Sequence, residues 1–317
     1  MRIPFKLVLA VAALVACVAP ATQIRAATCS PDAASSWVET GRESFKARGL
    51  PRSQGVAWDG RSWFFSWQGG ISRTNKDYLE QAITPIPPQL LVDHPYLNAD
   101  GTNHVGQNHV GDLDVYGGLV YAPIEDGDEN LELIRINDPD FQYPYVALFD
   151  AQTLLYTGVK YRLPLDIHHD GVPWVAVNGP ANEVYTAEWN NPTDRIFAWD
   201  LRMRFKRFID LVYPAELGAG FRLNRIQGAK VLGGTLYASR DDAAKSVYTI
   251  DIATGTVRKL FSMDPDVPAE SEGIAIRPMR DGSLLHVLLI VHNLDPTEDP
   301  DFAQTHVDLR HFAPRCG

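Results

Sequence analysis

The sequence is poor in positive charge and has no long apolar run beyond its first residues. Lys and Arg together number 29 against 39 Asp and Glu, which gives a net charge of −10 at pH 7. Nucleic acids and anionic lipids are bound by clustered basic residues that neutralise phosphates. We therefore expect neither as a partner. Beyond residue 30 no stretch approaches the roughly 20 apolar residues that a membrane helix needs, so we expect no membrane span.

The apolar run at the N-terminus extends from Leu7 to Ala16 and follows two basic residues. Such a pattern is typical of a secretory signal peptide. We expect residues 1–26 to be this signal, with cleavage after Ala21 or Ala26, and the protein to be secreted or periplasmic. Cys17 ends a segment similar to a lipobox, and lipoprotein anchoring through Cys17 stays open as an alternative.

Cysteine is scarce, with three residues in the chain. Cys17 lies inside the expected signal, which leaves Cys29 and Cys316 near the two ends of the mature chain. In an oxidising compartment two such residues form a disulfide, and we expect a Cys29–Cys316 bond. Residues 30–317 are long enough to form one all-β domain, which we expect to be monomeric.

The sequence also lacks any helical periodicity sustained over three turns, so helices should be minor. One pattern instead recurs five times: a glycine, a short apolar strand, a turn and a second apolar strand. The spacing between the copies is 45 to 60 residues, which is the size of a four-stranded propeller blade. The glycines that mark the copies are Gly55, Gly111, Gly171, Gly228 and Gly273.

These repeats predict an all-β fold, a five-bladed β-propeller. After Gly273 only 44 residues remain, enough for three strands of the last blade. The segment from Trp37 to Phe45 would supply the fourth, so that N- and C-terminal strands close the ring. Six blades stay open as an alternative, which would require residues 55–110 or 185–226 to be divided between two blades.

If five inner strands surround an axis, side chains at equivalent positions form rings. One position before each glycine lie Gln54, Val110, Asp170, Gln227 and Glu272. Three positions before it lie Arg52, Asn108, His168, Arg225 and Glu270. Because nine of these ten residues are polar, we expect a polar site at the mouth of the axial channel. The alternative is that these groups only bind one another and water.

Four residues of these rings offer mostly oxygen donors, which suit a divalent metal ion such as Ca²⁺. They are Asp170, Glu272, Gln54 and Gln227. A histidine nearby would act as a catalytic general base, and the candidates are His168 and His169. Substrate would be bound by polar groups at the same mouth, with arginine forks favouring an anionic group. These groups are Arg52, Arg225, Asn108 and His109.

The segment Ser271-Glu272-Gly273, with the copies Gln54-Gly55 and Asp170-Gly171, resembles the calcium-dependent phosphotriesterase-like superfamily of β-propellers, which includes gluconolactonase. The resemblance implies a central Ca²⁺ site and hydrolytic activity. In the gluconolactonase relatives a Glu-Gly-Pro motif opens the first blade of six. Here Gln54-Gly55-Val56 stands at that place, so the metal carboxylate would come from Glu272 or Asp170.

The leading functional hypothesis is therefore an exported hydrolase whose central divalent ion polarises an anionic ester, lactone, phosphoester or glycan. The rival is a non-catalytic propeller that binds a small molecule, a carbohydrate or a protein partner, because one fold hosts many functions. A third hypothesis is a carbohydrate-active enzyme that uses the carboxyl groups of Asp170 and Glu272 without a metal. The sequence contains no G-x-S-x-G, Walker or H-E-x-x-H motif that would favour another chemistry.

Overall fold

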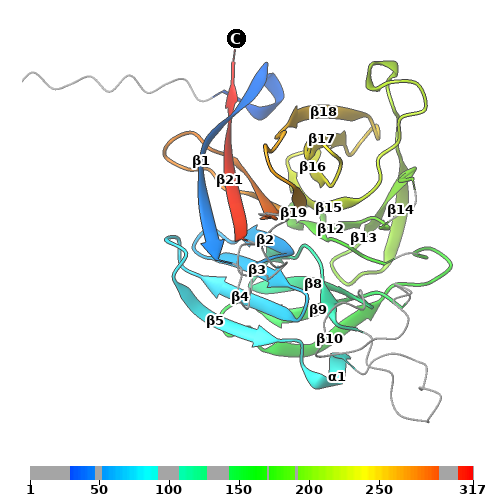
Figure 1. The fold of residues 1–317 in the computed structure, drawn as a ribbon. Helices are drawn as coiled ribbons and strands as arrows, with labels where there is room; N and C mark the ends of the chain where they lie inside the picture. The colour runs from blue at the N-terminus through cyan, green and yellow to red at the C-terminus, as the bar shows by residue number, and fades with distance from the viewer. Residues whose placement is uncertain are drawn as a thin grey trace, which may run out of the picture.

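The computed structural model describes residues 29–46, 52–91, 107–126, 143–169, 171–189, 192–292 and 306–316. Their strands form five antiparallel sheets, which are arranged around a common centre (Figure 1). The five-bladed β-propeller predicted from the repeats is confirmed. The expected signal peptide, including Cys17, and the expected metal ligand Asp170 lie outside the described residues.

Each blade is a sheet whose first strand lies nearest the axis. Blade 1 consists of β2 (Gly55–Trp58), β3 (Trp63–Trp67), β4 (Gly70–Thr74) and β5 (Glu80–Pro85). Blade 2 consists of β6 (His109–Val110), β7 (Asp114–Tyr116), β8 (Leu119–Glu125), β9 (Tyr145–Asp150) and β10 (Tyr156–Arg162). Blade 3 consists of β11 (Ala176–Asn178), β12 (Glu183–Thr186), β13 (Arg195–Trp199) and β14 (Phe205–Asp210).

Blade 4 consists of β15 (Ile226–Leu232), β16 (Thr235–Arg240), β17 (Ser246–Asp251) and β18 (Val257–Ser262). Blade 5 consists of β19 (Ala269–Ile276), β20 (Leu285–Val291), β21 (His306–Arg315) and β1 (Ser36–Lys46). Within the described ranges the helical segments are short: α1 (Pro88–Leu91) and the 3-10 turns Pro31–Ala33, Gly179–Ala181 and Ala215–Leu217. None of these helices is long and apolar enough to cross a membrane.

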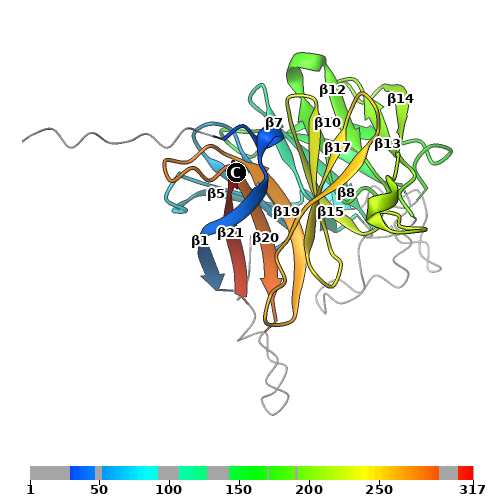
Figure 2. The same cartoon turned by 90° about the horizontal axis from the view of Figure 1, so that it is seen from above.

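The blades pack face to face through large apolar side chains, as propeller sheets require. Trp63 packs between blades 5 and 1, Trp199 between blades 2 and 3, and Trp174 between blades 3 and 4. All three indoles are essentially fully buried. Seen from above, the strands β1, β21, β20 and β19 lie side by side (Figure 2).

The two ends of the chain close the ring inside blade 5. Strand β1 pairs antiparallel with β21, from Ser36 opposite Arg315 to Lys46 opposite His306. The Cys29–Cys316 disulfide joins the same two ends, with 5.5 Å between the Cα atoms and 287 residues between the cysteines. Loop closure over that separation stabilises the fold by about 5–6 kcal/mol in the chain-entropy model. The disulfide also suggests a non-cytoplasmic location.

Blade 3 begins later than the repeat predicts. Its first strand was expected around Gly171 and Val172, whereas β11 starts at Ala176. Residues between them run along blade 2 instead: Asp112 and Trp174 form a parallel bridge, and the N–H of Val172 is bonded to the carboxylate of Glu125. The backbone groups of this segment are therefore used to join blades 2 and 3.

Asp112 is the hub of the propeller and is fully buried at its centre. Its carboxylate accepts the N–H of Val56 in blade 1 at 2.9 Å and that of Ala229 in blade 4 at 3.2 Å. The ammonium of Lys230 donates to the same carboxylate at 2.5 Å. Burial raises the pKa of Asp112 to about 7, although Lys230 and the N–H of Val56 act in the opposite direction. Such a buried charge is tolerated because it is paired and hydrogen-bonded.

Three of the five repeated glycines are explained by their close approach to this hub. A Cβ on Gly55 would lie 2.6 Å from the Cα of Asp112, and one on Gly228 would lie 2.7 Å from its Oδ2. A Cβ on Gly273 would lie 2.7 Å from both Asp112 Oδ1 and the Cα of Gly55. Only a residue without a side chain fits at these positions. Blades 1, 4 and 5 thus meet at Asp112, which joins them to blades 2 and 3.

Candidate functional site

The expected channel mouth corresponds to the place around Asp112 where the inner strands begin. Gln54, Gln227 and Glu272 each directly precede one of the glycines that meet at the hub. The N–H of Gly273 donates to the carbonyl oxygen of Gln54 at 2.9 Å, which places the first turn of blade 1 against Glu272 in blade 5. The structure therefore brings the backbones of these three expected metal ligands together around the axis.

Glu272 has an unusual electrostatic environment for a carboxyl group, since it is only 2 % exposed. Burial raises its pKa well above the ordinary value, and the carboxylates of Glu270, Asp241 and Asp112 raise it further. Arg225 acts in the opposite direction. This environment therefore favours a bound proton or an added positive charge over the bare carboxylate.

Arg225 is held beside Glu272 by Asp241. The guanidinium donates to Asp241 Oδ2 at 2.5 Å, and Lys245 donates to Asp241 Oδ1 at 2.7 Å. The N–H of Ser271 completes the contacts of this carboxylate at 3.0 Å. Asp241 is consequently occupied by three donors, so that its role is to position Arg225.

A second hydrogen-bonded chain joins blades 1, 2 and 3 across the mouth. His109 Nε2 lies 2.8 Å from Gln54 Oε1, and His109 Nδ1 lies 3.1 Å from Glu125 Oε1. The other oxygen of Glu125 accepts the N–H of Val172. Asn108, the neighbour of His109, is also buried. This chain fixes the orientation of the Gln54 side chain.

Three of the expected site residues, Arg52, His168 and His169, are placed elsewhere. Arg52 donates to the carbonyl oxygen of Tyr78 at 2.9 Å, and its guanidinium lies 4.4 Å from the ring centre of Phe45 in outer strand β1. His168 is fully buried, with its Nε2 3.1 Å from Thr186 Oγ1. Burial lowers the pKa of His168 to about 3, so this ring is neutral and enclosed.

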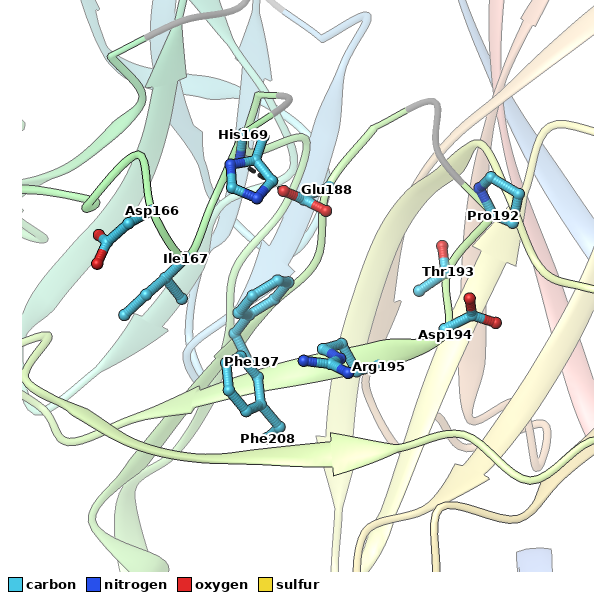
Figure 3. A pocket seen from close by; sticks show the side chains of 10 residues that line it. All are labelled: Asp166, Ile167, His169, Glu188, Pro192, Thr193, Asp194, Arg195, Phe197 and Phe208. Carbon is cyan, nitrogen blue, oxygen red and sulfur yellow. Dashed lines mark hydrogen bonds between the residues drawn. The ribbon is translucent and has the colours of Figure 1, made fainter.

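These residues were misplaced because the alternation of side chains between the two faces of a strand does not extend three residues before the glycines. Strand β2 begins at Gly55, and residues 52 to 54 form a turn and a bend. His168 precedes β11 by several residues. Positions three before the glycine therefore do not share one orientation. His169 lies on the same loop as His168 and lines a separate cavity on blade 3 (Figure 3).

Four charged residues of the site were missed by the sequence argument: Asp112, Lys230, Glu125 and Asp241. Glu125 is the last residue of β8, and Asp241 directly follows β16. Each of these strands lies next to the inner strand of its blade, and antiparallel pairing places its end beside the start of that inner strand. His109, for example, pairs with Glu125. Asp112 had its own signal, because it is the one polar residue directly after a repeat glycine, where the other copies have Val, Ala or Ile.

The predicted metal site depends in part on Asp170, which lies outside the described residues. Among the residues that the structure does describe, no three His, Cys, Asp or Glu side chains gather as a metal-binding group. Glu272, Gln54 and Gln227 would supply one carboxylate and two amide oxygens. These donors are of the hard-oxygen type that Ca²⁺ uses.

No family model matches the chain, and no curated protein matches it in sequence. Solved structures of similar shape include a luciferin-regenerating enzyme, with 13 % identity, coverage of 85 % of this chain and 95 % of that chain, and a TM-score of 0.47. A gluconolactonase from Xanthomonas campestris is 11 % identical over 88 % of this chain and 98 % of that chain, with a TM-score of 0.46. A nidogen/laminin complex is 13 % identical over 74 % and 71 %, with a TM-score of 0.43. At 11–13 % identity these likenesses concern the architecture alone.

Proposed function

We propose that the protein is an exported hydrolase whose active site is the channel mouth, with Glu272 as the proton donor. The observation that carries this proposal is the buried Glu272 carboxyl, whose pKa is raised well above the ordinary value by burial and by three neighbouring carboxylates. A carboxyl group with a raised pKa keeps its proton to a higher pH than an ordinary carboxyl group, which suits it to protonating a leaving-group oxygen. The substrate class is an ester, lactone, phosphoester or glycan.

Arg225 would orient the substrate through a negative or carbonyl oxygen. Its guanidinium is held by Asp241 and lies close enough to Glu272 to lower the pKa of that carboxyl. An arginine fork held in this way binds a carboxylate, phosphate or carbonyl oxygen with little loss of conformational freedom. Asp170 is the candidate for the second carboxyl group, as base or nucleophile.

The experiment compares wild-type protein with Glu272→Gln on nitrophenyl acetate, nitrophenyl phosphate, a γ-lactone and a set of nitrophenyl glycosides. We expect Glu272→Gln to lower kcat/KM by at least about 100-fold, because it removes the proton donor and retains the shape. Activity of the wild type should fall as the pH rises and Glu272 ionises. Glu80→Gln, an exposed change on outer strand β5, is the control and should retain activity.

Two outcomes would contradict the proposal. Equal activity of Glu272→Gln and wild type on every cleaved substrate would remove Glu272 from the reaction. No turnover of any substrate would favour the non-catalytic propeller that binds a small molecule or a carbohydrate.

A second possibility is that Glu272 binds a divalent cation and not a proton. Glu272 and Asp170 would hold Ca²⁺ together with the amide oxygens of Gln54 and Gln227, and the bound ion would polarise the oxygen under attack. This possibility is favoured by the several carboxyl groups that surround Glu272. Calcium at 100 times its Kd would stabilise the fold by about 2.7 kcal/mol. An unfolding temperature that is the same in Ca²⁺ and in EDTA would exclude it, and Glu272→Gln should abolish any shift.

A further inference from the structure

Two histidines contact each other inside blade 5, and neither belongs to the candidate site. His286 of β20 and His311 of β21 lie directly opposite each other in the antiparallel ladder. They are 0 % and 4 % exposed, respectively, and their Nδ1 atoms lie 2.7 Å apart. A hydrogen bond between two imidazoles requires one nitrogen that carries a hydrogen and one that does not. The protonation states of these two rings are therefore coupled.

The backbone of Arg277 determines the direction of this bond. His286 Nε2 lies 2.8 Å from the carbonyl oxygen of Arg277, which only accepts. The single hydrogen of a neutral His286 ring is therefore on Nε2, and its Nδ1 accepts from the Nδ1–H of His311. An additional proton on Nδ1 of His286 would leave two N–H donors facing each other at the same distance. The contact between the rings could not persist in that state.

The histidine pair lies where the ring of blades closes. Strands β1 and β21 run side by side (Figure 1), and Gly41 of β1 is opposite His311. A Cβ on Gly41 would lie 3.9 Å from Cδ2 of His311, and Thr40 donates to the carbonyl oxygen of His311 at 3.2 Å. On the other side, the ring of His286 meets the indole of Trp63 in blade 1 edge-on, with 5.2 Å between the ring centres. The pair thus contacts both the closing strand and the neighbouring blade.

The charged groups around the pair do not compensate for added protons. They are Glu39 of β1 and, between β19 and β20, Arg277 and Asp281; blade 1 contributes the neutral Trp63. Glu39 is paired with Arg310, and Asp281 already accepts the O–H of Ser283 at 2.7 Å and its N–H at 2.9 Å. Burial, the largest effect, lowers the pKa of both rings, to about 3 for His286, and the guanidinium of Arg277 lowers both further. The carboxylates act in the opposite direction but are outweighed.

We propose that the histidine pair is an acid-sensitive switch that releases β21, together with β1, from β20 at about pH 5. The closed blade does not accept protons on these rings, whereas released rings reach water and bind protons with the ordinary pKa of about 6.5. The closed state is therefore favoured above this pH and loses its advantage as the pH falls. The Cys29–Cys316 disulfide keeps β1 and β21 joined during the release. This switch is independent of the proposed hydrolytic function.

The test is hydrogen–deuterium exchange of the wild-type protein at pH 7 and pH 5, with rates corrected for the pH dependence of the chemical exchange step. A histidine that is protonated only in the released state favours release by about 25-fold between these pH values. The reference is blade 4, because residues 226–262 contain no histidine. We expect the protection of the amides that pair β20 with β21 to fall at least tenfold more than that of the amides that pair β15 with β16.

Variants separate the pair from other histidines of the chain. The double variant His286→Gln with His311→Asn keeps an amide N–H donor in each side chain but cannot bind a proton in this pH range. We expect the loss of protection in blade 5 to be at least tenfold smaller in this variant. The matched control is His306→Gln, which changes a histidine of β21 whose side chain is 35 % exposed and lies 3.4 Å from Asp308. This control should behave as the wild type does.

An equal loss of protection in blades 4 and 5 of the wild type would overturn the proposal, because the protein would then open as a whole. The absence of any loss in blade 5 at pH 5 would also overturn it. Both outcomes are measured on the wild type and decide the matter even if the double variant does not fold. Where the double variant has the circular dichroism spectrum of the wild type, an undiminished loss of protection in blade 5 would equally overturn the proposal.

Discussion

The ion pair at the hub makes a stability prediction that a double-mutant cycle can test. Asp112→Asn keeps the shape of the side chain and one acceptor oxygen, but it leaves the ammonium of Lys230 without its closest counter-charge. The two side chains are 0 % and 5 % exposed, respectively. Removing one partner of such a buried pair costs about 3–5 kcal/mol. We expect the lower end of this range, because Asp114 is close enough to interact with Lys230.

Lys230→Met should cost less, about 1–3 kcal/mol. Asp112 would keep the N–H donors of Val56 and Ala229, and its pKa of about 7 already lets it take up a proton at little cost. In the double variant, Asp112→Asn with Lys230→Met, no charge is left unpaired. The double variant should therefore be more stable than the sum of the single effects implies, with a coupling energy of about 2 kcal/mol.

The measurement is urea-induced unfolding of the four proteins at pH 7, followed by tryptophan fluorescence. A total stability of about 5–15 kcal/mol for a domain of this kind leaves each variant measurable. The exposed pair Lys76–Asp77 is the matched control, and Asp77→Asn should change stability by less than about 1 kcal/mol. Strictly additive effects at positions 112 and 230, or a cost of Asp112→Asn no larger than that of the control, would refute the reasoning.

Two further predictions concern acid stability and the axis. Burial lowers the pKa of His286 to about 3. Below pH 6.5 this histidine binds a proton in the unfolded chain but not in the folded one. The stability that is present above pH 6.5 is therefore lost as the pH falls, by about 2 kcal/mol at pH 5. Urea unfolding at pH 7 and pH 5 should show this loss in the wild type and a smaller one in His286→Gln, and equal losses would contradict the assignment. Gly273→Ala should destabilise the fold by about 1–3 kcal/mol or more, because its Cβ would lie 2.7 Å from the Cα of Gly55. The control is Gly234→Ala, whose Cβ would have no atom within 4 Å. This control should be close to neutral in the same assay.

The architecture could be predicted from the sequence because its signals are local. Apolar strands of four to eight residues and the glycines between them recur along the chain, and each blade is one such unit. The missing strand of the last blade pointed to the segment around Trp37, and β1 occupies that place. The pairing of Cys29 with Cys316 followed from the small number of cysteines, and the structure confirms it.

The candidate site was predicted only near the repeat glycines. Gln54, Gln227 and Glu272 each directly precede a glycine that packs against Asp112, and this contact, not regular strand geometry, places their backbones at the axis. Arg52 and His168 lie two residues farther out, where the chain enters the blade through turns and loops. Alternation of side chains holds only within a strand, so the sequence could not predict their direction.

The sequence by itself indicated the repeat, a ring of five or six blades, the closing strand and the disulfide, since each depends on residue type and spacing along the chain. The structure decided for five blades. Only the tertiary structure decided which charges meet. Asp112 and Lys230 are 118 positions apart, and no local pattern connects them. The raised pKa of Glu272 and the lowered pKa of His286 likewise depend on burial by distant segments, because solvent exclusion and Coulomb interactions act through space and not along the chain.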